Sequence, residues 1–165
     1  MVLYEQILRS LWKEKVKFLV VGGLAVNFHG FNRLTGDLDI IILLEDANIQ
    51  KLIKIAKRLK LKPRIPVRIE DFADAQKRRE WIKDKHMRAF ALCSPDNPAE
   101  HMDIVIEHRL DFEKAYRRKM VVHEGGLQIP VIAISDLLVM KKQAGRERDK
   151  IDIQALRRLR ELKHD

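Results

Sequence analysis

The stretch that most constrains the fold is residues 18–44, FLVVGGLAVNFHGFNRLTGDLDIIILL. Two apolar runs of strand length enclose a Gly22-Gly23 turn and a short helical segment, and the second run begins at Asp37 and Asp39. Glycines let a backbone turn come close to a ligand. Because side chains two positions apart on a strand share a face, both aspartates should point the same way while the alternate residues point into a core.

Two like charges at the mouth of an apolar strand repel each other, and a bound divalent cation would remove that penalty. A third acid, Asp103, begins the apolar run of HMDIVIE at residues 101–107. Three carboxylates from two strands would form a site for hard cations. In two-metal phosphoryl chemistry the ions lie about 3.5–4 Å apart. Asp37 and Asp39 could hold both ions, and Asp103 could hold one and accept a proton. The alternative is three solvated strand ends.

The composition narrows the class of protein. A chain of 165 residues is long enough for one domain with its own core. The single cysteine, Cys93, excludes an internal disulfide and fits a reducing compartment. No apolar run is long enough for a membrane span and the N-terminus lacks a signal layout, so we expect a cytoplasmic protein with no membrane partner. The net charge of +9 favours polyanionic partners such as nucleoside triphosphates, nucleic acid or an acidic protein, although solvated lysines would give the same excess.

The hydrophobic pattern predicts an α/β (α+β) fold with a small mixed sheet, flanking helices and a C-terminal helical pair. The predicted strands are 17–21, 34–44, 88–94, 101–107, 120–123 and 127–131, with a loop or edge at 62–66. The predicted helices are 3–15, 24–29, 47–61, 69–83, 111–119, a helix capped by Ser135 that runs through residue 144, and 148–162. We expect one domain over 1–165, with its core at about 1–132 and its C-terminal helices at about 133–165.

Better-known phosphate and metal motifs are excluded. The glycines fit neither the Walker loop G-x-x-x-x-G-K-[ST] nor the dinucleotide fingerprint G-x-G-x-x-G. The histidines do not form H-E-x-x-H, and Cys93 has no partner cysteine for zinc. What remains is the glycine turn, the paired aspartates and the later single aspartate.

That combination resembles the DNA polymerase β-like nucleotidyltransferase superfamily, whose signature is a strand ending in Gly-Gly or Gly-Ser, a spacer, and Asp-apolar-Asp. VGG, a thirteen-residue spacer and DLDI match it. More narrowly, the series Ala25, His29-Gly30, Arg33 and Thr35 resembles small prokaryotic proteins related to abortive-infection (AbiEii-type) nucleotidyltransferases. The tail at 129–156 is similar to theirs as well.

The resemblance implies transfer of a nucleoside monophosphate (NMP) from a nucleoside triphosphate (NTP) such as ATP to a hydroxyl, with Mg²⁺ and release of pyrophosphate. Gly22 and Gly23 would contact the triphosphate through backbone N–H groups. Asp37, Asp39 and Asp103 would be the metal ligands and catalytic triad. Relatives with Ser in place of Gly23 offer a hydroxyl to the phosphates, which this chain lacks.

Three further residues are candidates for nucleotide binding, each with a structural alternative. Arg33 could neutralise a phosphate or pair with Asp37 or Asp39. Thr35 could hydrogen-bond the aspartate loop or simply suit the strand start. Lys141 could reach a phosphate or be solvated.

The tail also carries a set of charges that we expect to form an ion-pair network fixing the last helix, and that helix should bury four apolar residues. The charges are Arg146, Arg148, Asp149 and Asp152; the apolar residues are Ile151, Ala155, Leu159 and Leu162.

The acceptor is left open between a protein side chain, a tRNA end and a small molecule such as an antibiotic. Two other functions remain as alternatives. One is a catalytically weak binding module, such as a toxin–antitoxin component with a protein partner. The other is a different phosphotransfer or nuclease use of the same carboxylates.

Overall fold

The computed structural model describes residues 3–164; residues 1, 2 and 165 of the predicted domain lie outside the described part. The strands are β1 (Phe18–Val21), β2 (Leu38–Ile42), β3 (Lys62–Pro63), β4 (Ala89–Cys93), β5 (His101–Val105), β6 (Met120–Glu124) and β7 (Leu127–Val131). The helices are α1 (Leu3–Lys13), α2 (Gly22–Phe28), α3 (Asp46–Arg58), the 3-10 helix η1 (Ile69–Ala73), α4 (Ala75–Lys85), α5 (Phe112–Arg117), α6 (Ile134–Ala144) and α7 (Glu147–His164).

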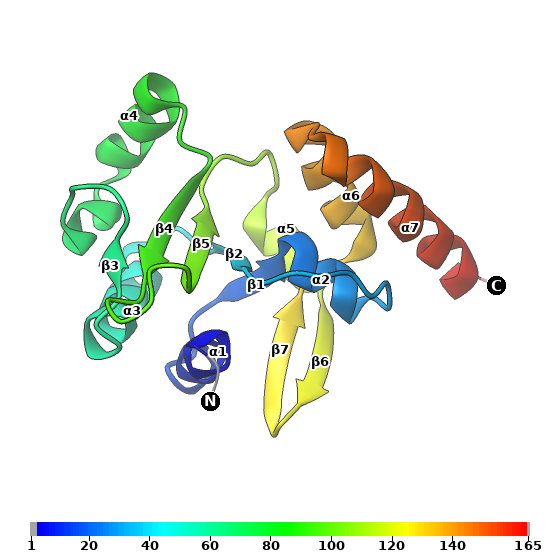
Figure 1. The fold of residues 1–165 in the computed structure, drawn as a ribbon, viewed down its shortest axis with the longest axis horizontal. Coiled ribbons are helices and arrows are strands. Elements are labelled where there is room, and N and C mark those ends of the chain that lie inside the picture. The colour runs from blue at the N-terminus through cyan, green and yellow to red at the C-terminus, as the bar shows by residue number, and fades with distance from the viewer. Residues whose placement is uncertain (1–2, 165) are drawn as a thin grey trace.

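All seven strands form one sheet in the order β3-β4-β5-β2-β1-β7-β6. The sheet is mixed, because β2 pairs with β5 and β1 with β7 in parallel while the other neighbours are antiparallel. Figure 1 shows α4 beside β3 and β4, and the C-terminal pair α6 and α7 at the other end of the molecule. The predicted mixed α/β fold is therefore confirmed. No described helix has the length and apolar character that a bilayer span requires.

The core forms on both faces of the central strands. Ile7 and Leu11 of α1 and Leu52 of α3 pack with Met102 of β5 on one face, where every side chain is at most 1% exposed. On the other face Leu19 of β1 lies opposite Ile41 of β2, and both are fully buried. Burial on two faces makes β2 a rigid support for the residue that lies between its buried positions, Asp39.

Several predicted elements differ from the structure at their ends. The strand predicted at 34–44 contains only Leu38–Ile42, because residues 31–37 form a loop. The helix predicted at 24–29 begins two residues earlier, at Gly22. The helix predicted at 69–83 is interrupted at Asp74, whose carboxylate accepts hydrogen bonds from the backbone N–H of Gln76 and Lys77 and so begins α4 anew. The predicted edge at 62–66 is the two-residue strand β3.

The C-terminal pair corrects two further predictions. Helix α6 begins at Ile134 after Ala133, so Ser135 lies inside the first turn and does not cap it. In α7, Ile151 and Leu162 are 63% and 65% exposed, and they do not point inward as predicted. The reason is that the inward face of α7 carries Asp149 and Asp152, which pair with cations of other elements.

Candidate active site

Two of the three predicted acids lie side by side in the middle of the sheet. Asp39 on β2 is in register with Asp103 on the parallel neighbour β5, and on its other side with Val21 on β1. Both carboxylates are largely buried. Asp37 precedes β2, and its side chain is 54% exposed. The central strands therefore place Asp39 and Asp103 directly, whereas Asp37 is the last residue of the loop at 31–37 that precedes β2.

Burial is the main factor that disfavours ionisation of Asp39 and Asp103. Burial, followed by the charges of Asp103 and Asp37, raises the pKa of Asp39 to about 6. Burial likewise raises the pKa of Asp103, and Asp37 adds to the rise while His101 and Arg64 oppose it. An arrangement that concentrates negative charge in this way is costly for the fold, and a cation would offset it.

His101 connects the acids in the described structure. Its Nε2 lies 3.6 Å from Oδ1 of Asp37 and 3.6 Å from Oδ1 of Asp103, while its Nδ1 lies 3.2 Å from Nη2 of Arg64. The sequence contained one signal of this arrangement, since His101 and Asp103 alternate on one strand and must share a face. Arg64 offered no such signal because its segment is irregular.

The donor set suits a hard divalent cation, since carboxylate oxygens are the ligands that Mg²⁺ prefers. Within residues 3–164, however, no three His, Cys, Asp or Glu side chains are gathered tightly enough to hold one ion. Asp39 and Asp103 are already adjacent, and Asp37 is directed toward His101. The carboxylate oxygens of the three acids are therefore suitable ligands for a divalent cation, and Asp39 and Asp103 already lie next to each other.

Gly22 brings the backbone against the Asp39 carboxylate. Its φ is +66°, and a Cβ built on it would lie 2.1 Å from Oδ2 of Asp39. Both observations require glycine, because a side chain would be strained by the backbone and would collide with the acid. The glycine at position 22 therefore allows the backbone to pass directly beside Asp39.

Replacing Gly22 with Ala is expected to destabilise the protein by about 1–3 kcal/mol and to displace the Asp39 carboxylate. Urea unfolding measures the first effect, and Mg²⁺ titration by calorimetry measures the second. Gly36→Ala is the matched control, because a Cβ at Gly36 meets nothing within 4 Å. Equal losses in the two variants would contradict the proposed role of Gly22.

Gly23 leaves space for two predicted nucleotide-binding residues. A Cβ at Gly23 would lie 2.8 Å from Oγ1 of Thr35 and 3.4 Å from Cζ of Arg33. The Thr35 hydroxyl thus occupies the space beside the turn where a side chain at position 23 would project. Gly23, Thr35 and Arg33 form one contiguous group next to Gly22.

Arg33 and Lys141 converge on the same carboxylate. Nη1 of Arg33 and Nζ of Lys141 lie 2.5 Å and 2.9 Å from Oδ2 of Asp152. Lys141 is also 3.4 Å from Oδ1 of Asp149, which Arg146 contacts as well. Arg33 therefore pairs with Asp152. The alternative predicted from the sequence, a pair with Asp37 or Asp39, is not formed among the described residues. Lys141 is 4% exposed, so the solvated alternative for it is wrong.

This buried ion cluster, defined as Arg33, Lys141, Arg146, Asp149 and Asp152, joins the loop before β2 to α6 and α7. The predicted ion-pair network is present, although Arg148 is exposed and takes no part in it. Burial by itself raises the pKa of Asp149, but the Arg146 hydrogen bond and the charges of Arg146 and Lys141 outweigh it and lower the pKa.

A cleft of about 320 Å³, here called the main cleft, opens between the strand ends and α6. Of the predicted residues, Gly22, Asp39, Asp103 and Lys141 line it, whereas Gly23, Arg33, Thr35 and Asp37 do not. Its wall also contains three arginines that the sequence analysis did not assign to the site: Arg88, Arg109 and Arg146. Arg88 precedes β4, Arg109 lies in the loop between β5 and α5, and Arg146 lies between α6 and α7, so only the three-dimensional fold brings them together.

Solved structures with the same architecture are nucleotidyltransferases. The lincosamide antibiotic adenylyltransferase LnuA, solved with lincomycin bound, superimposes with a TM-score of 0.62 at 17% identity, covering 96% of this chain and 98% of that one. ANT(2″)-Ia in complex with adenylyl-2″-tobramycin gives 0.59 at 11% identity, covering 93% and 85%. A putative nucleotidyltransferase from Thermotoga maritima gives 0.54 at 16% identity, covering 93% of each.

At these identities the likeness establishes the fold. No curated protein sequence is significantly similar to the chain. The chain belongs to the family described as nucleotidyltransferases of unknown function (DUF6036), whose sequence pattern matches residues 3–163. The superfamily prediction is confirmed, while the narrower abortive-infection branch stays a prediction.

Proposed function

We propose that this protein transfers a nucleoside monophosphate from an NTP to a hydroxyl group of an acceptor and releases pyrophosphate. The observation that carries the proposal is the register of Asp39 with Asp103 on adjacent parallel strands, with the Gly22 backbone against Asp39. Asp37, Asp39 and Asp103 would hold Mg²⁺, in a two-metal site, once Asp37 turns from His101 toward its neighbours. The bound ions would neutralise charge on the phosphates.

In the proposed reaction the acceptor oxygen attacks the α-phosphorus of the NTP. The new oxygen–phosphorus bond forms as the bond to the bridging oxygen of the leaving pyrophosphate breaks. Asp103 accepts the proton of the attacking hydroxyl, a role that its raised pKa suits. The burial of Asp103 between β4 and β2 fixes its orientation.

The remaining predicted residues would bind the triphosphate. Gly22 lines the main cleft, and its backbone approaches the reacting centre without a side chain in the way. Gly23 and Thr35 would extend this surface, with the Thr35 hydroxyl replacing the one that a serine at position 23 would supply. Lys141 lines the cleft, and Arg33 shares its partner Asp152. We propose that phosphate draws both cations partly away from that carboxylate.

We further propose that residues 1–165 act as one domain in the cytoplasm. Asp152 of α7 pairs with Arg33 from the loop before β2, so the C-terminal helices at about 133–165 are tied to the core at about 1–132. Cys93 is the single cysteine of the sequence, which suits a reducing compartment.

Incubation with Mg²⁺, radiolabelled NTPs and candidate acceptors tests the activity. We expect label transfer with stoichiometric pyrophosphate, and a loss of at least about 10²-fold in Asp37→Asn because that change removes a charged ligand. Asp46→Asn, at the start of α3 beyond the far end of β2, is the control and should retain activity.

Transfer that survives in Asp37→Asn would refute the assignment of the site. Release of orthophosphate or cleavage of RNA would indicate the alternative phosphotransfer or nuclease use. Binding of neither NTP nor Mg²⁺ by calorimetry would favour the binding-module alternative.

A further inference from the structure

Asp103 borders a second hollow in addition to the main cleft. This second hollow has a volume of about 340 Å³ and adjoins strands β4 and β5. Its lining is mostly apolar and includes two cations, Arg64 and Lys85. The volume is enough for one nucleotide-sized group. Because Asp103 lies in the walls of both hollows, a group bound in the second one can reach the same carboxylate that the main cleft exposes.

The strand register explains why Asp103 is accessible from this side. Ala91 of β4 is the residue directly opposite Asp103 of β5, and Ala89 is opposite Val105. These positions share one face of the hairpin and are only half-buried, whereas the alternate residues Phe90 and Leu92 are at most 1% exposed. Small side chains opposite and beside the acid leave room for a hydroxyl to approach it.

The charges around the two hollows are mostly positive. Among the described residues that line them, Glu107 is the one carboxylate besides Asp39 and Asp103. If the two aspartates serve Mg²⁺, a polycationic acceptor would find a single acid to bind and several cations to repel it. An acceptor that itself carries negative charge avoids both penalties.

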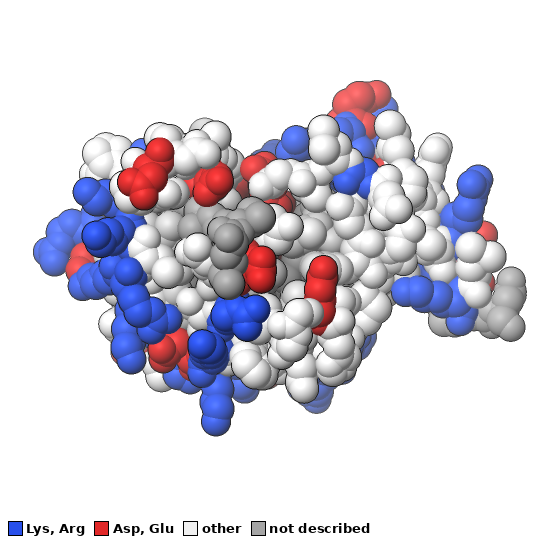
Figure 2. Space-filling model, turned by 60° about the horizontal axis from the view of Figure 1, so that its bottom comes forward, with Lys and Arg blue, Asp and Glu red and all other residues white. Residues whose placement is uncertain are grey.

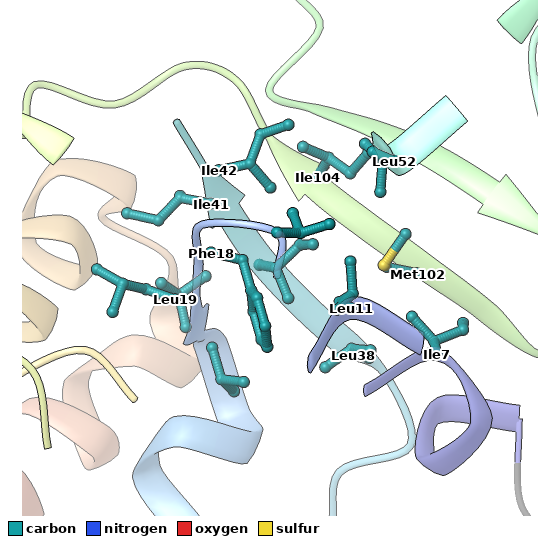
Figure 3. Packing of buried hydrophobic residues seen from close by; sticks show 14 of the residues in the cluster. Ile7, Leu11, Phe18, Leu19, Leu38, Ile41, Ile42, Leu52, Met102 and Ile104 are labelled. Atoms are coloured by element: carbon teal, nitrogen blue, oxygen red, sulfur yellow. The ribbon is translucent and has the colours of Figure 1, made fainter. Parts of the chain in front are cut away.

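The two cations of the second hollow are not held in salt bridges. Within residues 3–164, neither Arg64 nor Lys85 makes a salt bridge. Nη2 of Arg64 lies 3.2 Å from Nδ1 of His101, and the charge of Arg64 favours the ionised form of Asp103. Three basic side chains of α3 differ: Lys54 and Arg58 pair with Glu14, and Lys57 pairs with Glu70. Figure 2 shows one face of the molecule where Lys and Arg gather at one side with Asp and Glu among them. Arg64 and Lys85 are therefore not held by a salt bridge, whereas those three cations of α3 are.

We infer that the acceptor is the end of a single-stranded polynucleotide, bound in the second hollow with its terminal sugar hydroxyl directed at Asp103. Arg64 and Lys85 would contact its phosphates, and the apolar lining formed by Ile65, Met87 and the alanines of β4 would face its base or sugar. Exposed Lys62 of β3 and Lys83 of α4 lie close in sequence to Arg64 and Lys85, and they would extend the positive surface for further phosphates. This inference rests on the proposed function, because the bound end is an acceptor only if the protein transfers an NMP.

Fluorescence anisotropy with a labelled single-stranded RNA of about ten nucleotides, and with DNA of the same sequence, tests binding in the absence of NTP. Arg64→Gln and Lys85→Gln are each expected to raise Kd about 3–10-fold and to lower the salt slope of log K by about 1. Lys54→Gln, which removes a cation already paired with Glu14, is the matched control and should change Kd less than about 2-fold.

Label transfer then identifies the reacting end: RNA or DNA with a free 3′ hydroxyl should accept the NMP, and the same strand blocked by a 3′ phosphate should not. Equal effects in Lys54→Gln and Lys85→Gln would overturn the location of the binding site. Transfer to tobramycin, lincomycin or a protein, with none to either polynucleotide, would overturn the acceptor class while leaving the transferase activity intact. Polynucleotide binding that depends on Arg64 and Lys85, without any NMP transfer, would instead refute the proposed function and retain the binding site.

Discussion

Asp39→Asn is expected to make the protein more stable and to abolish nucleotidyl transfer. The ionised carboxylate is buried beside Asp103 and Asp37, and its pKa is raised to about 6 from 3.8, so the fold bears the cost of that charge at neutral pH. The neutral amide should increase the free energy of unfolding by about 1–3 kcal/mol when Mg²⁺ is absent. It should also lower kcat/KM by at least about 10²-fold because the central metal ligand is lost.

The pH dependence separates the two effects. The folded protein holds the Asp39 proton more tightly than the unfolded chain, so the destabilisation is absent below about pH 4, grows as pH rises, and is complete above about pH 6. The stability advantage of Asp39→Asn should therefore disappear in acid. Transfer by the unaltered protein should fall as pH drops below about 6, and higher Mg²⁺ should move that midpoint downward because the ion competes with the proton.

Chemical denaturation from pH 4 to pH 8, with and without Mg²⁺, measures the stability curves, and kcat/KM for the NTP measures activity over the same range. Asp46→Asn, in the first turn of α3, is the control for a change from acid to amide. A stability difference that is independent of pH, or a variant less stable at pH 8, would show that the ionised Asp39 carboxylate does not destabilise the fold.

Lys141→Met is expected to cause the largest loss of stability, about 3–5 kcal/mol. Lys141 is the cation between Asp149 and Asp152, whose side chains are 1% and 3% exposed. Methionine fills the same space without a charge, so both carboxylates lose a partner that solvent cannot replace. Arg146 and Arg33 remain to compensate them in part.

Lys142→Met is the matched control, because the next residue of α6 is exposed and is expected to change stability by less than about 0.5 kcal/mol. Urea unfolding of the two variants gives the comparison. Adding Asp152→Asn to Lys141→Met should recover part of the loss, since it removes a buried charge that has lost a partner. Losses of equal size at positions 141 and 142, or a double variant with strictly additive losses, would contradict the role of the buried ion cluster.

The central part of the fold could be predicted from sequence because local patterns determine it. Apolar runs of strand length, the Gly22-Gly23 turn and the spacing of Asp37 and Asp39 are all visible in 27 consecutive residues. The strands predicted at 88–94 and 101–107 flank the turn-forming run Pro-Asp-Asn-Pro, and the structure pairs them as the antiparallel strands β4 and β5. Parallel pairing of β2 with β5 is a long-range property that no local pattern contains.

The errors arose where partners distant in sequence decide which way a residue faces. The helical pattern of α7 suggested that Ile151 points inward, but Asp152 occupies the inward position because Arg33, 119 residues away, pairs with it there. Arg88, Arg109 and Arg146 could not be assigned to the main cleft for the same reason. His29, named above only as part of the resemblance, is buried, and its Nε2 lies 2.7 Å from the carbonyl oxygen of Ile132.

The position of the carboxylates in the sheet has a consequence for how proteins of this kind diversify. Asp39 and Asp103 are on β2 and β5, near the middle of the strand order, whereas Arg64 follows the edge strand β3 and Lys85 is the last residue of α4. Substitutions at the periphery leave the central packing intact, because peripheral segments carry few of the core side chains. Descendants of one ancestral enzyme could therefore acquire different acceptors through changes at that edge, while inheriting the reacting centre unaltered.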